Sequence, residues 1–319
     1  MRRRQFLGLA SGAAAWPLAV RAQEAGRTYR IGFLTPVERP AYRAVFDELR
    51  LNGFIEGRNL EVAPGGFGVP HDQISKVAAA LVKSAPDAII AGPEPPLRAL
   101  QVMTQTIPLL SMVEDMVAAG LVASLSRPGG NTTGISLMSP SFDGKRQDIL
   151  IEAVPGMRRI AALVDTNAIV SHLQVLQEGA RARGVTLQVI NVARRDDVLA
   201  AIDSAKASGA EAINFLASPM FSTGSSAFIE RVTALRLPSI FQWPENAEEG
   251  ALAGYGPRFA ALGRQRARQL IKVLRGAKPA DIPVEQPTQF ELVINLKTAK
   301  AIGHEVPAGL VLHADKLIE

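Results

Sequence analysis

Small hydroxyl, amide and acidic residues follow several Val-, Ile- and Leu-rich segments of this 319-residue chain. In an open parallel sheet, ligands bind beyond the carboxyl ends of the strands, where the next helix offers free N–H groups. Such side chains supply the donors and acceptors that hold an amino acid or a small carboxylate. The positions are Thr35-Pro36, Gly92-Pro93-Glu94, Glu114-Asp115, Asp165-Thr166-Asn167, Ser218-Pro219 and Gln242-Trp243.

Each part of an amino-acid-like ligand has a candidate partner among these residues. Thr35 and Ser218 would bind a carboxylate beside helix N-termini. Asp115 or Glu94 would pair with an ammonium group, and Trp243 would stack on the ligand's side chain. The predicted ligand-binding residues are Thr35, Pro36, Gly92, Glu94, Glu114, Asp115, Asn167, Ser218, Pro219 and Trp243.

Every one of these residue types also has a purely structural use. Thr, Ser and Asp are preferred N-caps of helices, which is a competing interpretation for Thr35, Ser218 and Asp115. The Trp243 side chain is equally suited to core packing, and Glu94 to a solvated surface. The sequence leaves these alternatives open.

The sequence carries no recognisable catalytic or metal-binding motif. It has no Gly-x-Ser-x-Gly elbow and no phosphate-binding loop, and the absence of Cys excludes disulfides and thiolate sites. The four His residues do not have the spacing of metal ligands. We therefore expect no cofactor, no metal and no catalysis. An enzyme that uses Asp115 and Asp165 as an acid–base pair is the less favoured alternative, because nothing beside them supplies a nucleophile.

The elements that must position these residues alternate between apolar runs and helix-period segments, which is typical of parallel sheets covered on both faces. The first half predicts strands at 29–35, 60–63, 87–92 and 107–112, and helices at 42–51, 73–83 and 97–104. The second half repeats the plan, with strands at 159–165, 186–192, 211–217 and 237–243, and helices at 171–183, 197–207 and 227–235. We predict an α/β fold of two doubly wound parallel-sheet lobes.

Further elements follow the second lobe. A short strand precedes a helix at 257–274, and a Pro-rich segment then leads to a strand at 290–295. This order predicts a hinge in which the chain crosses three times between lobes, a geometry suited to closing on a ligand. The expected first lobe is 28–135 with a return at 250–283, and the expected second lobe is 136–249 with a return at 284–319.

Residues 1–22 have the pattern of a secretory signal. Three Arg residues precede an uncharged run of 16 residues, too short to span a bilayer comfortably. The Arg3-Arg4-Gln5-Phe6-Leu7 sequence favours twin-arginine export, with cleavage after about Ala22 and a periplasmic location. Without these residues, 31 of the 35 basic residues face 30 acidic ones, so no nucleic-acid partner is expected.

Four segments resemble the ABC-transporter substrate-binding protein family, which is related to the tryptophan-binding lipoproteins of Gram-positive bacteria. They are GLVASLSRPGGNTTGISL (120–137), GKRQDILIEAVPGMRRIAALVD (144–165), AGYGP (253–257) and the C-terminal block 276–319. The resemblance covers the whole chain and implies a type I periplasmic binding fold. It also implies a monomer that captures a small solute, such as an amino acid or an aromatic acid, and presents it to an inner-membrane ABC permease and its ATPase.

This chain departs from the family pattern at several cleft positions. Glu114-Asp115-Met116 stands where members often carry Gly-Asp-Pro, and Pro93-Glu94-Pro95-Pro96 replaces small residues. The solute of one member is therefore not transferable to this chain. We interpret the sequence as a periplasmic solute-binding protein, with a ligand-sensing module for a receptor kinase as the alternative.

Overall fold

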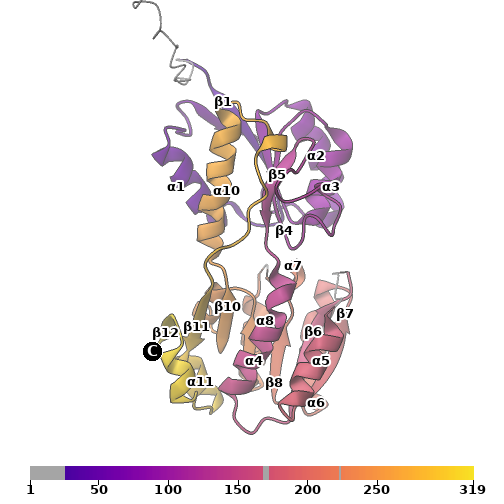
Figure 1. Ribbon diagram of the computed structural model, residues 1–319, viewed down its shortest axis with the longest axis vertical. Coiled ribbons are helices and arrows are strands. Elements are labelled where there is room, and N and C mark those ends of the chain that lie inside the picture. The colour runs from indigo at the N-terminus through magenta and orange to yellow at the C-terminus, as the bar shows by residue number, and fades with distance from the viewer. Residues whose placement is uncertain (1–25, 168–171, 223) are drawn as a thin grey trace, which may run out of the picture.

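Two β-sheets, each covered by helices on both faces, form two lobes stacked along the long axis of the molecule (Figure 1). The computed structural model describes residues 26–167, 172–222 and 224–319. The expected signal at residues 1–22 lies outside the described residues. Among the described residues, no helix combines the length and the apolar character needed to cross a membrane.

The first lobe contains five parallel strands in the order β2-β1-β3-β4-β5. They are β1 (Tyr29–Leu34), β2 (Leu60–Val62), β3 (Ala88–Ala91), β4 (Leu109–Val113) and β5 (Thr132–Ser136). The covering helices are α1 (Arg43–Leu51), α2 (Ile74–Lys83), α3 (Glu94–Met103) and α10 (Phe259–Leu274), with single turns η1 (Arg39–Tyr42), η2 (His71–Gln73) and η5 (Pro279–Asp281).

The sequence of β3 explains why helices cover both faces of this sheet. Side chains alternate between the two faces of a strand, yet all four residues of β3 are apolar and fully buried. Ala88 and Ile90 pack into the core that includes α1 and α10 residues, and Ile89 and Ala91 pack into the core that includes α2 and α3 residues. Uninterrupted apolar strands of this kind require a layer of helices on each side.

The second lobe contains seven strands in the order β12-β11-β10-β9-β8-β6-β7, of which only the β10–β11 pair is antiparallel. They are β6 (Arg159–Asp165), β7 (Thr186–Val192), β8 (Ala212–Phe215), β9 (Ser239–Phe241), β10 (Ala253–Gly256), β11 (Glu291–Asn295) and β12 (Lys316–Ile318). The helices are α4 (Asp143–Ala153), α5 (Leu173–Ala182), α6 (Val198–Ala207), α7 (Pro219–Ser222), α8 (Ser226–Ala234), α9 (Pro244–Glu248), α11 (Leu296–Ile302) and α12 (Ala308–Leu312), with turns η3 (Ser139–Phe142) and η4 (Arg195–Asp197).

The prediction of two parallel-sheet α/β lobes is confirmed, with differences in individual elements. Helix α3 begins at Glu94 rather than at residue 97, because proline is tolerated in a first turn whose N–H groups have no helical partner. The sequence did not indicate β5, whose Thr residues are buried. The Thr133 hydroxyl donates to the Ile282 carbonyl at 2.8 Å, a contact between residues 149 positions apart.

The chain crosses between the lobes three times: from β5 to α4, from β10 to α10, and from η5 to β11. The first and third crossings are joined by backbone hydrogen bonds. Glu285 N donates to Gly134 O, and Ser136 N donates to Glu285 O, both at 2.9 Å. The two crossings therefore leave the first lobe as a paired unit.

The second crossing lies later than the expected return at residue 250. Strand β10 still belongs to the second lobe, because Ala253 and Gly254 pair with Ile240 and Phe241 of β9. The chain enters the first lobe only between Gly256 and Phe259, where α10 begins. The boundary at 250 was wrong because strand pairing, which the sequence does not display, holds this segment in the second sheet.

We predict that Gly134→Ala strongly destabilises the protein. Gly134 has φ +146°, and a Cβ atom there would lie 2.0 Å from the Ser111 carbonyl oxygen of β4. We expect the free energy of unfolding to fall by roughly 2–4 kcal/mol in urea titrations. The control is Gly144→Ala in α4, where the new Cβ meets only Leu176 at 3.8 Å. Equal stabilities of the two variants would contradict the prediction.

Candidate functional site

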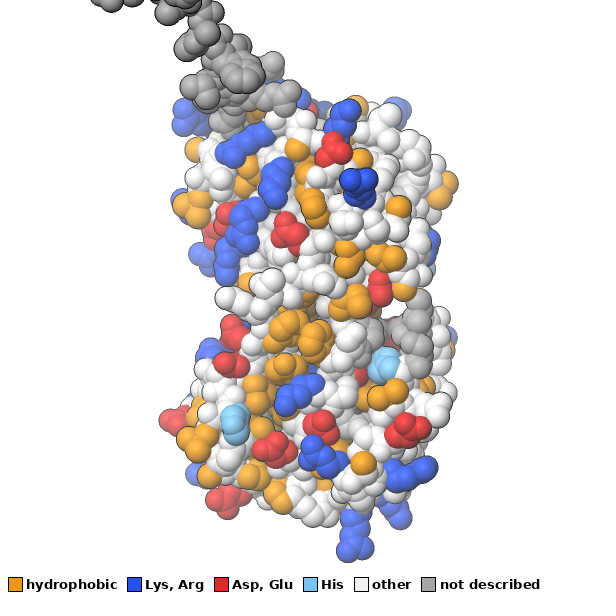
Figure 2. All heavy atoms as spheres, viewed as in Figure 1, with side chains coloured by type: hydrophobic (Ala, Val, Ile, Leu, Met, Phe, Trp, Pro, Cys, Tyr) orange, Lys and Arg blue, Asp and Glu red, His pale blue; other side chains and the backbone are white. Residues whose placement is uncertain are grey.

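A cleft of about 1320 Å³ lies between the two lobes. It is lined by residues at the carboxyl ends of β1, β3, β4 and β5 of the first sheet, and of β6, β8 and β9 of the second. In the first sheet β1 lies beside β3, and in the second β6 lies beside β8, so strand order reverses at these pairs. Such switch points are where open α/β sheets bind ligands. Figure 2 shows the molecule narrowing where the lobes meet, with hydrophobic side chains across this level.

The cleft brings together most of the residues selected from the sequence. Those that line it are Thr35, Gly92, Glu94, Glu114, Asp115, Asp165, Asn167, Pro219 and Trp243, whereas Pro36 and Ser218 are not among the lining residues. They come from both lobes, although the chain separates the first from the last by more than 200 residues. Contact of each residue with a ligand stays a prediction.

Ser218 is occupied by structural contacts in the second lobe. Its hydroxyl donates to Asp165 Oδ2 at 2.6 Å and accepts from Met220 N at 3.0 Å in the first turn of α7. Its side chain is buried. The capping interpretation therefore describes the contacts of Ser218 in this structure.

The acid–base pair considered from the sequence, Asp115 and Asp165, consists of two carboxylates that hold loops in place. Asp165 Oδ1 accepts from the backbone N and the side-chain amide of Asn167, at 2.8 and 3.1 Å. Asp115 Oδ1 accepts from Val117 N and Ala118 N, at 3.0 and 2.9 Å. These contacts fix the loops after β6 and β4, and thereby shape the cleft.

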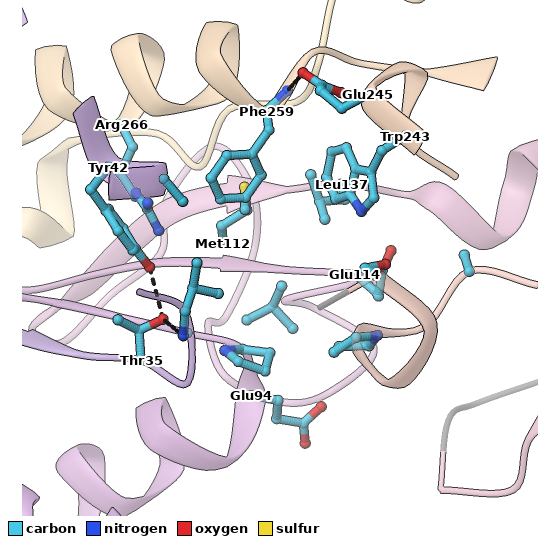
Figure 3. Close-up of a pocket in the computed structure, with 18 of the residues that line it drawn as sticks. Thr35, Tyr42, Glu94, Met112, Glu114, Leu137, Trp243, Glu245, Phe259 and Arg266 are labelled. Atoms are coloured by element: carbon cyan, nitrogen blue, oxygen red, sulfur yellow. Dashed lines mark hydrogen bonds between the residues drawn. The ribbon is translucent and has the colours of Figure 1, made fainter. Parts of the chain in front are cut away.

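Three aromatic or apolar side chains accompany Trp243 in the cleft, and none was among the predicted ligand-binding residues. Trp243 packs in one cluster with Met112 of β4, Leu137, which directly follows β5, and Phe259 of α10. The rings of Trp243 and Phe259 meet edge to face, with centroids 5.7 Å apart. We call these four residues the apolar wall (Figure 3). Because Trp243 is buried yet lines the cleft, the packing and ligand-contact interpretations are both compatible with its position.

A second group missed from the sequence consists of Tyr42 and Arg266, which lie next to Thr35 (Figure 3). The Tyr42 hydroxyl donates to Thr35 Oγ1 at 2.9 Å, and Val37 N donates to the same oxygen at 3.1 Å. The Arg266 guanidinium lies over the Tyr42 ring, 5.2 Å from its centroid. Tyr42 and Arg266 belong to η1 and α10, so only the packing of α10 on the first lobe brings them together.

Glu114 and Gln242 connect the two sides of the cleft. Gln242 follows β9 of the second lobe, and Glu114 follows β4 of the first. Gln242 Nε2 donates to Glu114 Oε1 at 3.2 Å. Glu94 instead pairs with Arg98 of its own helix at 2.6 Å and is partly exposed. Of the two acids, Glu114 is therefore the one that reaches the opposite lobe.

His172 lines the second-lobe side of the cleft and contacts a buried ion pair. Its Nε2 lies 2.8 Å from Asp143 Oδ2, and Asp143 Oδ1 accepts from Arg146 at 2.5 Å and from Ala217 N at 3.0 Å. Asp143 and Arg146 are both 1% exposed. This cluster fixes α4 against the loop after β8. Across the described ranges, no group of three or more His, Cys, Asp or Glu side chains could hold a metal ion.

Glu245, in the first turn of α9, is a partly buried acid in the cleft lining. Burial raises the pKa of its carboxyl group, while hydrogen bonds from backbone N–H groups, including Phe259 N at 3.0 Å, and the charge of Arg258 act in the opposite direction. Glu248, one turn later, has the opposite balance. Its pKa is lowered because contacts with Lys316 and Arg258 outweigh its desolvation.

Comparison with known proteins places this architecture in a family. The family model described as ABC transporter substrate binding protein matches residues 32–318. A tyrosine-binding protein of Clostridioides difficile (strain R20291) is 27% identical over 280 residues, which are 85% of this chain and 80% of that protein.

Solved structures share the fold over most of the chain. A conserved domain protein from Vibrio cholerae superposes with a TM-score of 0.80 at 25% identity, over 91% of this chain and 100% of the other. An ABC domain from Streptococcus pneumoniae in complex with L-Trp gives a TM-score of 0.79 at 23% identity, over the same shares. A ligand-free, open substrate-binding protein from Clostridium difficile gives 0.63 at 25% identity, over 91% and 99%.

We predict that Glu245→Gln and Glu248→Gln change stability in opposite directions. Because the folded-state pKa of Glu245 is raised, its ionised carboxylate makes the folded protein less stable, and this loss of stability develops as pH rises from about 4.5 through the raised pKa. Glu245→Gln removes that charge and should therefore raise Tm at pH 8. A lowered pKa gives Glu248 a stabilising contribution above about 4.5, so Glu248→Gln should lower Tm at pH 8.

The measurement is Tm from pH 3 to pH 8 for both variants and the unmodified chain. We expect the Glu245→Gln difference to disappear below about pH 4.5, and the Glu248→Gln difference to shrink as pH falls through the lowered pKa. Parallel Tm curves for all three proteins would contradict both assignments.

Proposed function

We propose that this chain, which belongs to the ABC transporter substrate-binding protein family, binds an aromatic or large apolar amino acid for import. The observation that carries the proposal is the apolar wall of Trp243, Phe259, Leu137 and Met112 inside a cleft that also presents charged and polar side chains. Aromatic rings stack on such a wall, and charged groups at its edge orient the ligand backbone. The tyrosine-binding relative and the L-Trp complex are consistent with this class of ligand.

The lobes close on the ligand through the three crossings. Type I folds of this kind move by rotation about a few connecting segments, while each lobe stays rigid. The Glu114–Gln242 hydrogen bond, at 3.2 Å, is a contact that only approaching lobes make. A ligand that touches both lobes shifts the equilibrium toward the closed state by its differential affinity for that state.

The place of action is the periplasm, and the partner is an ABC permease with its ATPase. Residues 1–22 carry the export signal inferred from the sequence, and the mature chain acts as a monomer. Binding by itself completes the role of this chain, since the energy of transport comes from the ATPase.

We predict that aromatic amino acids stabilise the folded protein. A ligand that binds only the folded state raises Tm by mass action, and a concentration of 100 times Kd adds about 2.7 kcal/mol. We expect 1 mM L-tyrosine or L-tryptophan to raise Tm by several degrees in a thermal-shift assay, and glucose to leave Tm unchanged. The proposal fails if no aromatic or apolar amino acid shifts Tm.

We predict that Trp243 reports and supports binding. The chain has two Trp residues, Trp16 and Trp243, so Trp243 is the single fluorophore of its class in a Trp16→Phe chain. L-tyrosine or L-leucine should shift its emission, because the ligand replaces water at the wall. Trp243→Ala should weaken binding about 10- to 100-fold by calorimetry. Unchanged emission and affinity, with circular dichroism showing a folded chain, would place the ligand elsewhere.

A further inference from the structure

We infer that Arg266 of α10 binds the carboxylate of the ligand, together with the Thr35 hydroxyl. This inference rests on the proposed function and deepens it, because it states which chemical group the solute must carry. The sequence pointed to Thr35 and Ser218 as the partners of the carboxylate and gave no sign of Arg266. Three observations on Arg266 support the assignment: its burial, its missing counter-ion and its neighbours.

Arg266 is 2% exposed, yet it lines the cleft. Among the described residues, no carboxylate lies within ion-pair distance of its guanidinium and no acceptor receives a hydrogen bond from it; its Nε is buried without a partner. Arginine stays protonated in proteins, so the charge remains when the side chain is buried. Buried charges are unfavourable unless they are paired, and this cation is left for an anion that the described part of the chain does not supply.

Arg146 is the other buried arginine among the residues that the structure describes, and its charge is paired. Arg146 is 1% exposed and lies 2.5 Å from Asp143, which is equally buried. Helix α10 lines the cleft, Arg266 included, whereas no residue of α4 is among those that line it. Arg146 of α4 therefore stabilises the fold through its ion pair, whereas Arg266 of α10 lines the cleft that a ligand would occupy.

An aromatic ring and a hydroxyl donor lie beside Arg266 (Figure 3). Its guanidinium lies over the ring of Tyr42, and the Tyr42 hydroxyl donates to Thr35 Oγ1. Thr35 Oγ1 also accepts from Val37 N, so both of its lone pairs are occupied and its own O–H remains to donate. A guanidinium and a hydroxyl donor held by one tyrosine form a site for a carboxylate oxygen pair (Figure 3).

The position of Arg266 relative to the apolar wall sets the shape of the ligand. Phe259 and Arg266 are seven residues apart in α10, which places them on the same face of the helix. The Phe259 ring also meets the Tyr42 ring edge to face, at 6.5 Å between centroids. The carboxylate site is thus continuous with the wall, so the solute is a carboxylate with an adjoining apolar or aromatic group, and an amine that lacks the carboxylate binds more weakly.

The test compares matched ligands by calorimetry on the full chain. The probes are L-tyrosine, tyramine, which lacks only the carboxylate, and 3-(4-hydroxyphenyl)propanoate, which lacks only the amine. The variants are Arg266→Met and Arg266→Lys, with Arg268→Met as the control, since Arg268 is 56% exposed on the same helix and is not among the cleft-lining residues. L-tryptophan and tryptamine provide a second pair.

We expect tyramine to bind the unmodified chain about 10- to 150-fold more weakly than L-tyrosine, the range of one charge-assisted hydrogen bond, and the propanoate to bind measurably. Arg266→Met should reduce the tyramine-to-tyrosine ratio of Kd values to near one. Arg266→Lys, which keeps the charge without the planar fork, should give an intermediate ratio and provides the readout if Arg266→Met does not fold. Arg268→Met should leave the ratio unchanged.

Different results would contradict the proposed function and the assignment of Arg266 to the carboxylate. If the unmodified chain binds neither aromatic amino acid, the proposed function is wrong. If it binds L-tyrosine or L-tryptophan but accepts the matching amine equally well, or if both Arg266 variants keep the original ratio, the proposed function stands and the carboxylate assignment is overturned.

Discussion

Parallel strand pairing is the constraint on which the cleft depends. In a parallel sheet all carboxyl ends meet at one edge, so the five strands of the first lobe and the five mutually parallel strands of the second, β6 to β10, send the segments that follow them to common edges. The three crossings orient those edges toward each other, and the pairing of Glu285 with β5 holds two of the crossings together. Residues scattered over the whole chain therefore border one space.

Helix α10 gives the cleft its chemical character. It follows the last second-lobe strand before the second crossing, yet it packs against α1 and the first sheet. One face of α10 buries Ala267, Leu270 and Ile271 in the first-lobe core, while Phe259 and Arg266 reach the cleft. The same helix thus joins the lobes, closes the first core and supplies both an apolar group and a cation to the site.

Several polar residues near the cleft serve its geometry. Asp165, Asn167 and Ser218 hydrogen-bond to one another and to backbone groups, and Asp115 holds the loop after β4. Since buried polar groups are unfavourable without partners, these contacts keep the loops in one conformation. At the cleft, Arg266 keeps a buried Nε without a hydrogen-bond partner, and the Thr35 hydroxyl, which accepts from Tyr42 and Val37, still has its proton to donate.

The sequence by itself determined the two-lobed parallel architecture, because an apolar run such as β3 can be buried only between two layers of helices. It also located Thr35, Gly92, Glu114 and Trp243 at the cleft, since strand ends in such sheets converge. The tertiary structure alone decided that β10 belongs to the second sheet and that Tyr42 and Arg266 meet. Those outcomes depend on pairing and packing between residues far apart in the chain, and neither hydrophobic period nor local spacing records such contacts.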